Sequence, residues 1–167
     1  MDHVDDLQME EEPDTGDAPE NDIRLGPLSN FFGYHLRLAQ EASFQAFARR
    51  VDTTGLRSGY FSVLVLIGLN PGITQTALSR ATSRDKSTLT PTLRLLEDRK
   101  LIQREQFKND RRSYMLRLTP EGEKAAEELM QHASVHEREL NRIVGADKSA
   151  DLLAALRRIA ESLQNRS

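Results

Sequence analysis

Residues 101–121, LIQREQFKNDRRSYMLRLTPE, contain two runs in which apolar and polar side chains alternate. These runs, Leu101–Gln106 and Ser113–Leu118, lie on either side of a short polar turn. Alternation with period two around such a turn predicts a β-hairpin. Because its exposed tip is rich in cations, the hairpin is suited to contact a polyanion. The charged residues of the tip are Lys108, Asp110, Arg111 and Arg112.

Two short helical segments precede the hairpin. The first can begin at Thr74, whose hydroxyl is a good N-cap. A break follows at residues 82–85, where either Ser83 or Asp85 can cap a second helix that runs to about Arg99. Two short helices followed by a hairpin predict a winged helix-turn-helix, in which the second helix enters the major groove of DNA.

Longer helices flank this core. Residues 28–51 have a wide apolar face, with Ser29 as a plausible N-cap. Residues 58–69 are apolar almost all round, so this helix is expected at the buried centre. After the hairpin, one helix is expected over 119–144, and the last, over 148–163, has leucines at near-heptad spacing. The predicted fold class is mainly α with a small β-hairpin wing (α+β).

The first helix and the last two have apolar stripes longer than a core of ~65 residues can cover. A second copy of the chain is the simplest partner for such stripes, since two-fold dimers are the commonest oligomers. We therefore expect a winged helix-turn-helix core at residues 56–118, with a helical dimerisation domain formed by residues 28–52 and 120–165. Together they would make a single domain over residues 26–167.

Charge is separated along the chain. Residues 1–22 have ten acidic side chains and no lysine or arginine, a local charge of −10. A net charge of −3 then leaves +7 on the remainder, and residues 80–117 alone carry +6. A basic body is what nucleic-acid binding requires. Residues 1–25 are expected to be a disordered acidic tail, either an inert leader or an electrostatic brake on DNA binding.

Several classes of protein are excluded by composition. The absence of cysteine excludes disulfides, thiolate metal sites and cysteine redox switches. Neither a membrane span nor a secretory signal is evident, so we expect a cytoplasmic protein without a membrane partner. His132 and His136 could share a metal ion, but no third ligand is evident and we favour an exposed helix face. No catalytic set or phosphate loop stands out, and we expect neither catalysis nor a cofactor.

Five segments, in this order and at these spacings, resemble the MarR family of bacterial transcriptional regulators over about residues 28–165. The segments are Asn70–Leu78 (NPGITQTAL), Asp85–Thr90 (DKSTLT), Leu96–Ile102 (LEDRKLI), Asp110–Arg112 (DRR) and Leu118–Gly122 (LTPEG). The resemblance implies an obligate homodimer that binds palindromic DNA. It also implies a small-molecule pocket between the dimerisation helices and the DNA-binding lobe.

Pro91 departs from the commonest family pattern, which has arginine or another helix former in the recognition helix. Proline removes the amide that would bond Ser87 and restricts Thr90, at a cost of ~3 kcal/mol in a helix interior. The run at 88–91 resembles members that sense organic hydroperoxides, but those depend on a cysteine that this chain lacks. We expect Pro91 to affect how the helix sits in the groove.

The helix that opens at Asp85 is expected to present small hydroxyls and a lysine to the major groove, with nearby arginines on phosphates. In the wing, Arg112 would enter the narrow minor groove. Asp110 would orient Arg112 as its ion pair, while the other wing cations would meet the backbone. The predicted DNA-binding set is Arg80, Arg84, Lys86, Ser87, Thr88, Thr90, Thr92, Arg94, Lys108, Asp110, Arg111 and Arg112.

A ligand pocket is expected where the first long helix meets the second. Residues 33–37, GYHLR, offer a phenol, an imidazole and a guanidinium, and they resemble the same region in regulators of aromatic-acid degradation. A guanidinium beside aromatic rings suits an aromatic carboxylate or the phosphates of its coenzyme A thioester. Core aromatics with ordinary surface charges are the alternative. The predicted ligand residues are Phe31, Tyr34, His35, Arg37, Leu38 and Phe61.

The leading hypothesis is a ligand-responsive dimeric transcriptional regulator. It would be a repressor that an aromatic acid or its coenzyme A thioester releases from an inverted-repeat operator in double-stranded DNA. The alternative is a winged-helix protein-interaction module without sequence-specific DNA binding, since fold does not fix function. The arginine-rich wing favours the first hypothesis. An enzyme, the third class, would need an unforeseen pocket with perturbed titratable groups.

Overall fold

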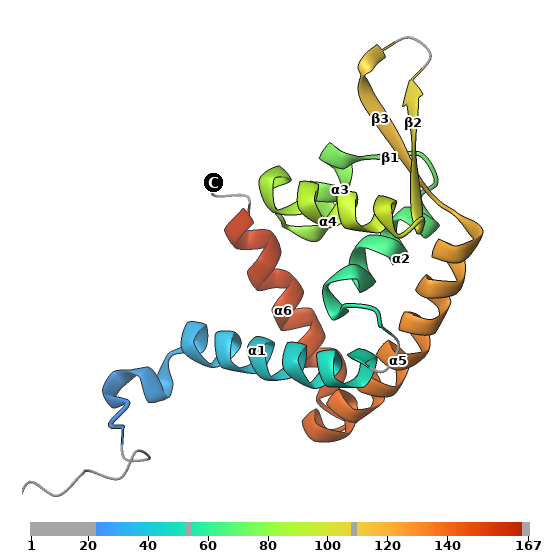
Figure 1. The fold of residues 1–167 in the computed structure, drawn as a ribbon. Helices are drawn as coiled ribbons and strands as arrows, with labels where there is room; N and C mark the ends of the chain where they lie inside the picture. The colour runs from blue at the N-terminus through green and yellow to red at the C-terminus, as the bar shows by residue number, and fades with distance from the viewer. Residues whose placement is uncertain (1–22, 53–54, 108–109, 165–167) are drawn as a thin grey trace, which may run out of the picture. The chain divides into compact units, whose positions relative to one another are not determined.

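A computed structural model describes residues 23–52, 55–107 and 110–164, and for residues 107, 110–113 and 164 it describes the backbone alone. Six α-helices and three strands, with two short 3-10 helices, are described in these residues (Figure 1). The chain divides into two compact units, the first ending at Ala39 and the second beginning at Gln40. The predicted fold class is confirmed, while most of the predicted acidic tail lies outside the described residues.

The start of the first long helix was predicted wrongly. A 3-10 helix, η1 (Gly26–Asn30), comes first, and α1 (Phe32–Val51) begins after it. Gly26 has a φ of +53°, a left-handed conformation that glycine adopts without steric cost. The Ser29 hydroxyl donates to the Gly26 carbonyl at 2.8 Å, so it closes the 3-10 turn and does not cap α1.

Helix α2 (Phe61–Leu69), which follows the 3-10 helix η3 (Ser58–Tyr60), lies at the centre of the second unit as predicted. The side chains of Val63, Leu64 and Ile67 are inaccessible to solvent. Helix α2 packs against α3, α5 and β3, so its apolar residues supply the middle of the core. Fully buried leucines complete that core from the surrounding elements, and they are Leu78, Leu89, Leu93, Leu96, Leu116 and Leu129.

The helix-turn-helix is formed by α3 (Gln75–Thr82) and α4 (Lys86–Asp98). Thr74 caps α3 as predicted, since its hydroxyl accepts from the amide of Ala77 at 3.2 Å. Asp85 is the N-cap of α4, although its side chain makes no capping hydrogen bond, and Ser83 instead ends α3 with a φ of +51°. Of the two caps considered for the second helix, the backbone therefore selects Asp85.

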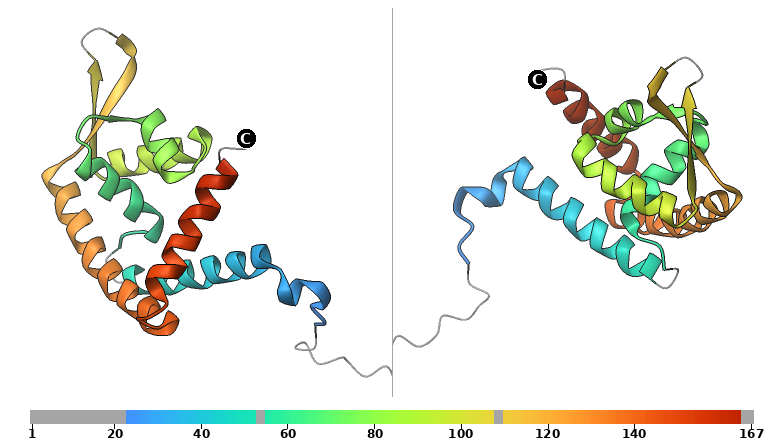
Figure 2. Two further views of the ribbon diagram at one scale, coloured as in Figure 1. Left: turned by 180° about the vertical axis from the view of Figure 1, so that it is seen from behind. Right: turned by 45° about the horizontal axis from the view of Figure 1, so that its top comes forward.

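The wing is a three-stranded antiparallel sheet in the order β1-β3-β2. Its hairpin strands are β2 (Ile102–Phe107) and β3 (Asp110–Leu118), and in all three views they project beyond the neighbouring helices α3 and α4 (Figures 1 and 2). The third strand, β1 (Ile73–Thr74), pairs Ile73 with Leu116 and was not predicted. It ties the start of α3 to the base of the wing.

Helix α5 (Pro120–Val144) begins as predicted at Thr119, whose hydroxyl accepts from the Gly122 amide at 3.0 Å. The same hydroxyl donates to the Lys100 carbonyl at 2.5 Å. Gly122 lies directly on the backbone before the wing, because a Cβ at this position would lie 1.8 Å from the carbonyl oxygen of Leu101. These contacts fix α5 against the start of β2.

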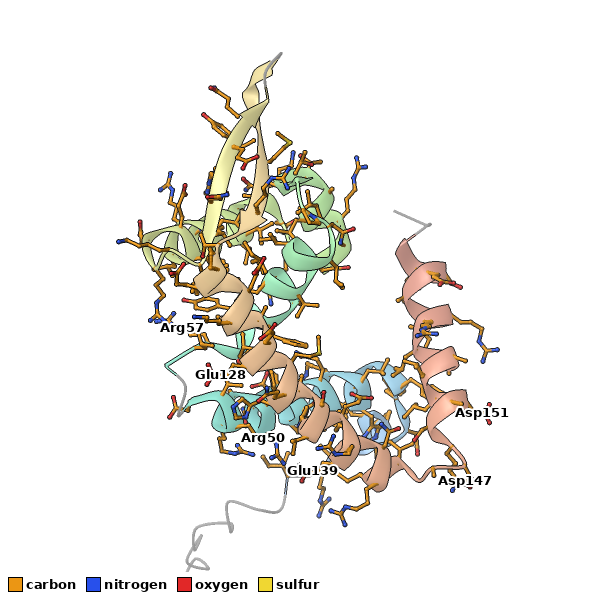
Figure 3. The ribbon with its side chains drawn as sticks, turned by 90° about the vertical axis from the view of Figure 1, so that its right-hand side faces the viewer. Arg50, Arg57, Glu128, Glu139, Asp147 and Asp151 are labelled. Atoms are coloured by element: carbon orange, nitrogen blue, oxygen red, sulfur yellow. The ribbon has the colours of Figure 1, made fainter. Side chains whose placement is uncertain are left out.

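The remaining features are a salt bridge between α1 and α5 and an exposed apolar stripe on the last helix. Arg50, near the end of α1, pairs with Glu139 of α5 in a salt bridge (Figure 3). Helix α6 (Ser149–Gln164) exposes its leucine stripe, with side chains between 38% and 61% accessible at Leu152, Leu153, Leu156, Ile159 and Leu163. Across the described residues, no helix is long and apolar enough to cross a membrane.

Candidate nucleic-acid interface and ligand cavity

The exposed sides of α3 and α4 form the candidate recognition face. Helix α4 buries Leu89, Leu93 and Leu96 on one side, which directs its polar positions outward. Two successive helices that present polar side chains beside a hairpin match the geometry by which a helix is inserted into a major groove. Of the residues predicted to bind DNA, Arg80, Lys86, Ser87, Thr88 and Arg94 are exposed, and Arg84, Thr90 and Thr92 are half-buried.

Gln75 joins the two helices of this face and was missed by the sequence analysis. Its Nε2 atom donates to the Thr90 hydroxyl at 2.8 Å. That hydroxyl in turn donates to the carbonyl of Lys86 at 2.7 Å. A signal was available, because Thr90 precedes Pro91 and therefore needs support in a helix, but no sequence pattern says which side chain supplies that support.

A polar hollow of about 340 Å³ lies beside this contact, between α3, α4 and the sheet. It contains the two cations Lys86 and Arg104. The Nε atom of Arg104 lies 3.0 Å from a carboxylate oxygen of Glu97, so this charge is already paired. Lys86 is exposed, and its ammonium group forms no salt bridge with a carboxylate of the described residues, which makes it the better candidate for a phosphate.

The four predicted wing residues are only partly placed. Lys108 and the side chains of Asp110, Arg111 and Arg112 lie outside the described part of the protein. The backbone of β3 is described from Asp110, where the strand begins at the outer end of the hairpin. At the base of the wing, Arg117 donates to Glu105 across the two strands at 2.9 Å.

The polar residues predicted to bind a ligand lie together in the first unit. The rings of Tyr34 and His35 meet edge to face with centroids 5.5 Å apart, and the guanidinium of Arg37 lies 5.8 Å from the centre of the Tyr34 ring. His35 donates from Nε2 to the carbonyl of Ser29 at 2.8 Å. The predicted phenol, imidazole and guanidinium therefore form one cluster, while the neighbouring Phe31 and Leu38 are exposed.

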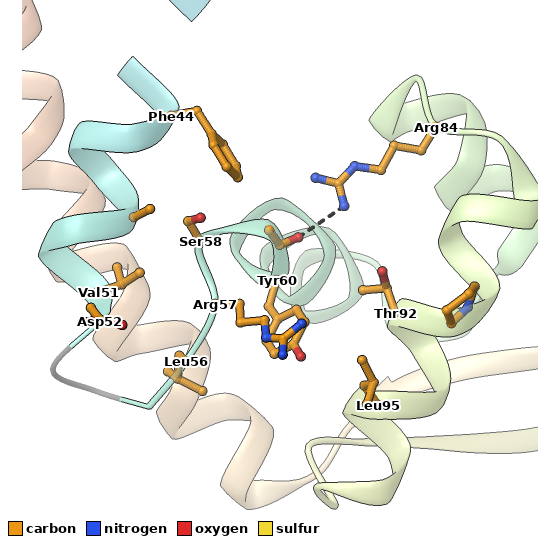
Figure 4. Close-up of a pocket in the computed structure, with 13 residues that line it drawn as sticks. Phe44, Val51, Asp52, Leu56, Arg57, Ser58, Tyr60, Arg84, Thr92 and Leu95 are labelled. Atoms are coloured by element: carbon orange, nitrogen blue, oxygen red, sulfur yellow. Dashed lines mark hydrogen bonds between the residues drawn. The ribbon is translucent and has the colours of Figure 1, made fainter. Parts of the chain in front are cut away.

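The second unit has a cavity of about 520 Å³ at a different place (Figure 4). Its walls come from the end of α1, the segment before α2, and the side of α4 that carries Pro91, Thr92 and Leu95. Arg84 extends into it, and its Nη1 atom donates to the carbonyl of Gly59 at 3.1 Å. The apolar lining includes Phe44, Val51, Leu56, Tyr60, Pro91 and Leu95.

An adjoining cavity of about 360 Å³ shares Phe44, Ser58 and Arg84 with the first. Among the predicted ligand residues Phe61 lines this one. Neither cavity includes Phe31, Tyr34, His35, Arg37 or Leu38, all of which belong to the first unit. Arg84 is the cation common to both cavities, and the sequence had suggested it only as a phosphate contact.

His136 does not lie on an exposed helix face, which corrects the sequence interpretation. Only 9% of the residue is accessible, its Nε2 atom is hydrogen-bonded to Ser43 Oγ at 3.0 Å, and its ring packs on Phe47. It is a packing residue between α1 and α5, and it lines the smaller cavity. In the described part of the chain, no group of three or more histidine or acidic side chains could hold a metal ion.

Comparison with known proteins gives a consistent result. The MarR family model matches residues 56–114. A protein of Thauera aromatica, named as a transcriptional regulator of the hcr operon, is 33% identical over 80% of this chain and 81% of its own length.

Solved structures extend the comparison to the fold. The repressor CouR bound to a 23-mer DNA duplex is 33% identical, covers 83% of this chain and 98% of its own, and superimposes with a TM-score of 0.77. CouR bound to p-coumaroyl-CoA is 31% identical over 83% of this chain and 97% of its own, with a TM-score of 0.76. A structure of MarR itself is 29% identical over 81% of this chain and 99% of its own, with a TM-score of 0.67.

Proposed function

The chain belongs to the MarR family of DNA-binding transcriptional regulators, and from this premise we propose that it is a homodimeric repressor released from its operator by an aromatic acid or the coenzyme A thioester of one. Family membership favours DNA binding over a pure protein-interaction module, and the family is one of regulators, not of enzymes.

The observation that carries the proposal is the position of Arg84 in a cavity walled by the recognition helix. Pro91, Thr92 and Leu95 of α4 line the same cavity as the Arg84 guanidinium (Figure 4). A molecule that fills this cavity would contact these three residues of α4, the helix that would present Lys86 and Ser87 to DNA. Ligand binding and helix position are thereby linked through shared residues.

The chemistry of the cavity favours an aromatic anion. Phe44 and Tyr60 offer aromatic surface, while Arg84 offers a planar guanidinium that pairs well with a carboxylate or a phosphate. The two adjoining volumes, about 520 and 360 Å³, lie in the usual range for small-molecule sites of roughly 300–1,000 Å³. They suit the aromatic acyl part of a thioester, whose nucleotide would extend outside.

The CouR complex with p-coumaroyl-CoA supports a thioester, since CouR is 31% identical over most of this chain. A thioester has several phosphates and needs more than one cation. Arg37, clustered with Tyr34 and His35 in the first unit, is the cation that the sequence predicts for the anion, with the two rings on a polar substituent. A free acid would need Arg84 alone.

The recognition face would act on DNA as one half of a two-fold pair. The residues predicted from sequence would contact bases from the start of α4 and phosphates from Arg80 and Arg94, with Arg112 in the minor groove and Asp110 orienting it. A dimer then requires an inverted repeat whose half-sites are about one helical turn apart. An effector can release such a dimer only by its differential affinity for the two states, and ~100-fold weaker DNA binding needs about 2.7 kcal/mol of coupling.

Titration of the protein–DNA complex tests this proposal. The DNA upstream of the protein's own gene is the first probe, and p-coumarate and p-coumaroyl-CoA are the first effectors. If only the thioester releases the DNA, a site with two cations is supported. If the acid and the thioester both release it, one cation is enough. Arg37→Ala should then resist the thioester but not the acid. A complex that neither compound dissociates would contradict the assignment to this effector class.

A further inference from the structure

Helix α4 has a weak point in the turn that it presents to DNA. Pro91 lies inside the helix and has no amide hydrogen, so the carbonyl of Ser87 lacks its usual donor four residues on. The proline ring also disfavours the helical conformation of the residue before it, which is Thr90. The amide of Leu89 still donates to the Asp85 carbonyl at 3.0 Å, so the first turn, residues 86–90, keeps a backbone bond at its start and lacks the one at Ser87.

Thr90 is held by its side chain. Its hydroxyl donates to the Lys86 carbonyl at 2.7 Å and accepts from Gln75 Nε2 at 2.8 Å. The Thr90 hydroxyl thus uses its hydrogen as a donor and its oxygen as an acceptor. The Gln75 amide also lies 3.5 Å from the Lys86 carbonyl. The residue that the proline destabilises is therefore the one that Gln75 binds.

Gln75 is itself well anchored. It is the first residue of α3, and the preceding Thr74 caps that helix through Ala77. Thr74 also pairs with Met115 of β3 in the sheet. The fully buried Leu78 fixes the next turn of α3 in the core. A side chain that extends from this base can hold the first turn of α4 at a defined place beside the wing.

We propose that Gln75 is a positioning residue for DNA recognition: through Thr90 and the Lys86 carbonyl it supports the first turn of α4, which Pro91 deprives of a backbone hydrogen bond at Ser87. Lys86 and Ser87 belong to this turn and are exposed, so the position in which they would meet DNA depends on Gln75. The inference rests on the DNA-binding activity of the family and requires neither the effector nor the dimer.

Direct reading of DNA by Gln75 is the competing role, because glutamine can bind adenine through two hydrogen bonds. The two roles differ in one respect. A positioning residue becomes dispensable once the backbone bond is restored, whereas a residue that touches a base does not.

A double-mutant cycle with Gln75→Met and Pro91→Ala separates them. Methionine keeps the length of the side chain and removes its donors, and alanine at 91 restores the amide that can bond Ser87. The probe is a duplex that the unmodified protein selects from a random-sequence pool, with a shuffled duplex as the non-specific reference.

Gln75→Met should weaken binding to the selected duplex by about three- to tenfold, the range for one lost hydrogen bond. In the Pro91→Ala background, the same exchange should cost less than about twofold. Binding to the shuffled duplex should weaken less than binding to the selected duplex, because Gln75 has no charge and Lys86, the candidate phosphate contact of this turn, is displaced but not removed.

An equal loss in both backgrounds would overturn the proposal and indicate a direct contact, and no loss at all would overturn it as well. Thr90→Val gives a second test that does not depend on the proline variant. It removes the hydroxyl that binds both Gln75 and the Lys86 carbonyl, so Thr90→Val combined with Gln75→Met should lose no more than Thr90→Val alone. Additive losses would contradict a shared contact. Thermal unfolding of each variant identifies any that fails to fold.

Discussion

The Nη1 atom of Arg84 donates a hydrogen bond to the carbonyl oxygen of Gly59 across 3.1 Å. The bond connects the turn before α4 with the segment before α2, and it keeps the guanidinium at the boundary of the two cavities. Arg84 is therefore positioned to respond to a ligand on one side and to move the start of the recognition helix on the other.

Arg84→Gln should reduce effector response more than DNA affinity. Glutamine removes the charge that would bind the anion, so release from DNA should need about tenfold more effector, the effect of roughly 1.4 kcal/mol. If Arg84 instead contacts a phosphate, the slope of log affinity against log salt should fall by about one. Arg94→Gln, on the exposed side of α4, is the control expected to change the slope. Fluorescence anisotropy over a salt series measures both quantities.

The wing should contribute strongly to affinity. Arg112→Ala is expected to lose about 1–3 kcal/mol of binding free energy, the scale of one specific contact. Asp110→Ala should also weaken binding, although it removes a negative charge near DNA, because the arginine loses its orienting partner. Tighter binding by Asp110→Ala would contradict the orienting role and support a simple charge effect. Equilibrium binding at fixed salt distinguishes these outcomes.

The parts of the fold that follow from neighbours in the sequence could be predicted. Thr74 and Thr119 each cap the helix that follows by accepting from the amide three residues on, and the alternation of apolar and polar residues predicted the two hairpin strands. The strand at Ile73–Thr74 has two residues and is too short for a periodic signal. It is defined only by its pairing with β3.

Contacts between distant residues explain what was missed in the site. His136 is buried by Ser43 and Phe47, which lie about ninety positions earlier, so its own helix periodicity could not indicate burial. The phosphate contact of Arg84 stays a prediction; its bond to the Gly59 carbonyl, 25 positions earlier, had no local signal in the sequence.

Gly122→Ala should destabilise the protein severely. A Cβ at position 122 would lie 1.8 Å from the carbonyl oxygen of Leu101, which also accepts from the amide of Thr119 at 3.1 Å. Backbone on both sides must move, and overpacking of this kind costs about 1–3 kcal/mol or more. Gly33→Ala is the matched control, since nothing lies within 4 Å of its Cβ and alanine favours a helix by roughly 0.5–1 kcal/mol. Denaturant unfolding compares the two, and equal stabilities would contradict the packing described.

Glu139 should make stability sensitive to acid. The Arg50 guanidinium, first through its hydrogen bond and then through its charge, lowers the pKa of Glu139 below the ordinary value of 4.5. A lowered folded-state pKa gives stability that is present above 4.5 and is lost as pH falls through the folded value. Glu139→Gln should flatten the melting temperature between about pH 5 and pH 3. The effect should be small because the pair is open to solvent. An unchanged acid slope would show that other carboxylates dominate.

Charged substitutions on α6 should prevent dimer formation without unfolding the chain. Leu156 and Ile159 are each 38% accessible in the single chain, so glutamate at these positions would face water in a monomer but would be buried in a dimer. Because burying unpaired charge costs far more than exposing it, Leu156→Glu with Ile159→Glu should sediment as a monomer and lose specific DNA binding. Leu69→Glu is the control: it is 74% accessible at the end of α2, outside the predicted dimerisation helices, and should leave the dimer intact. A parent protein that sediments as a monomer and still binds the inverted repeat would defeat the dimer proposal, whatever the variants do.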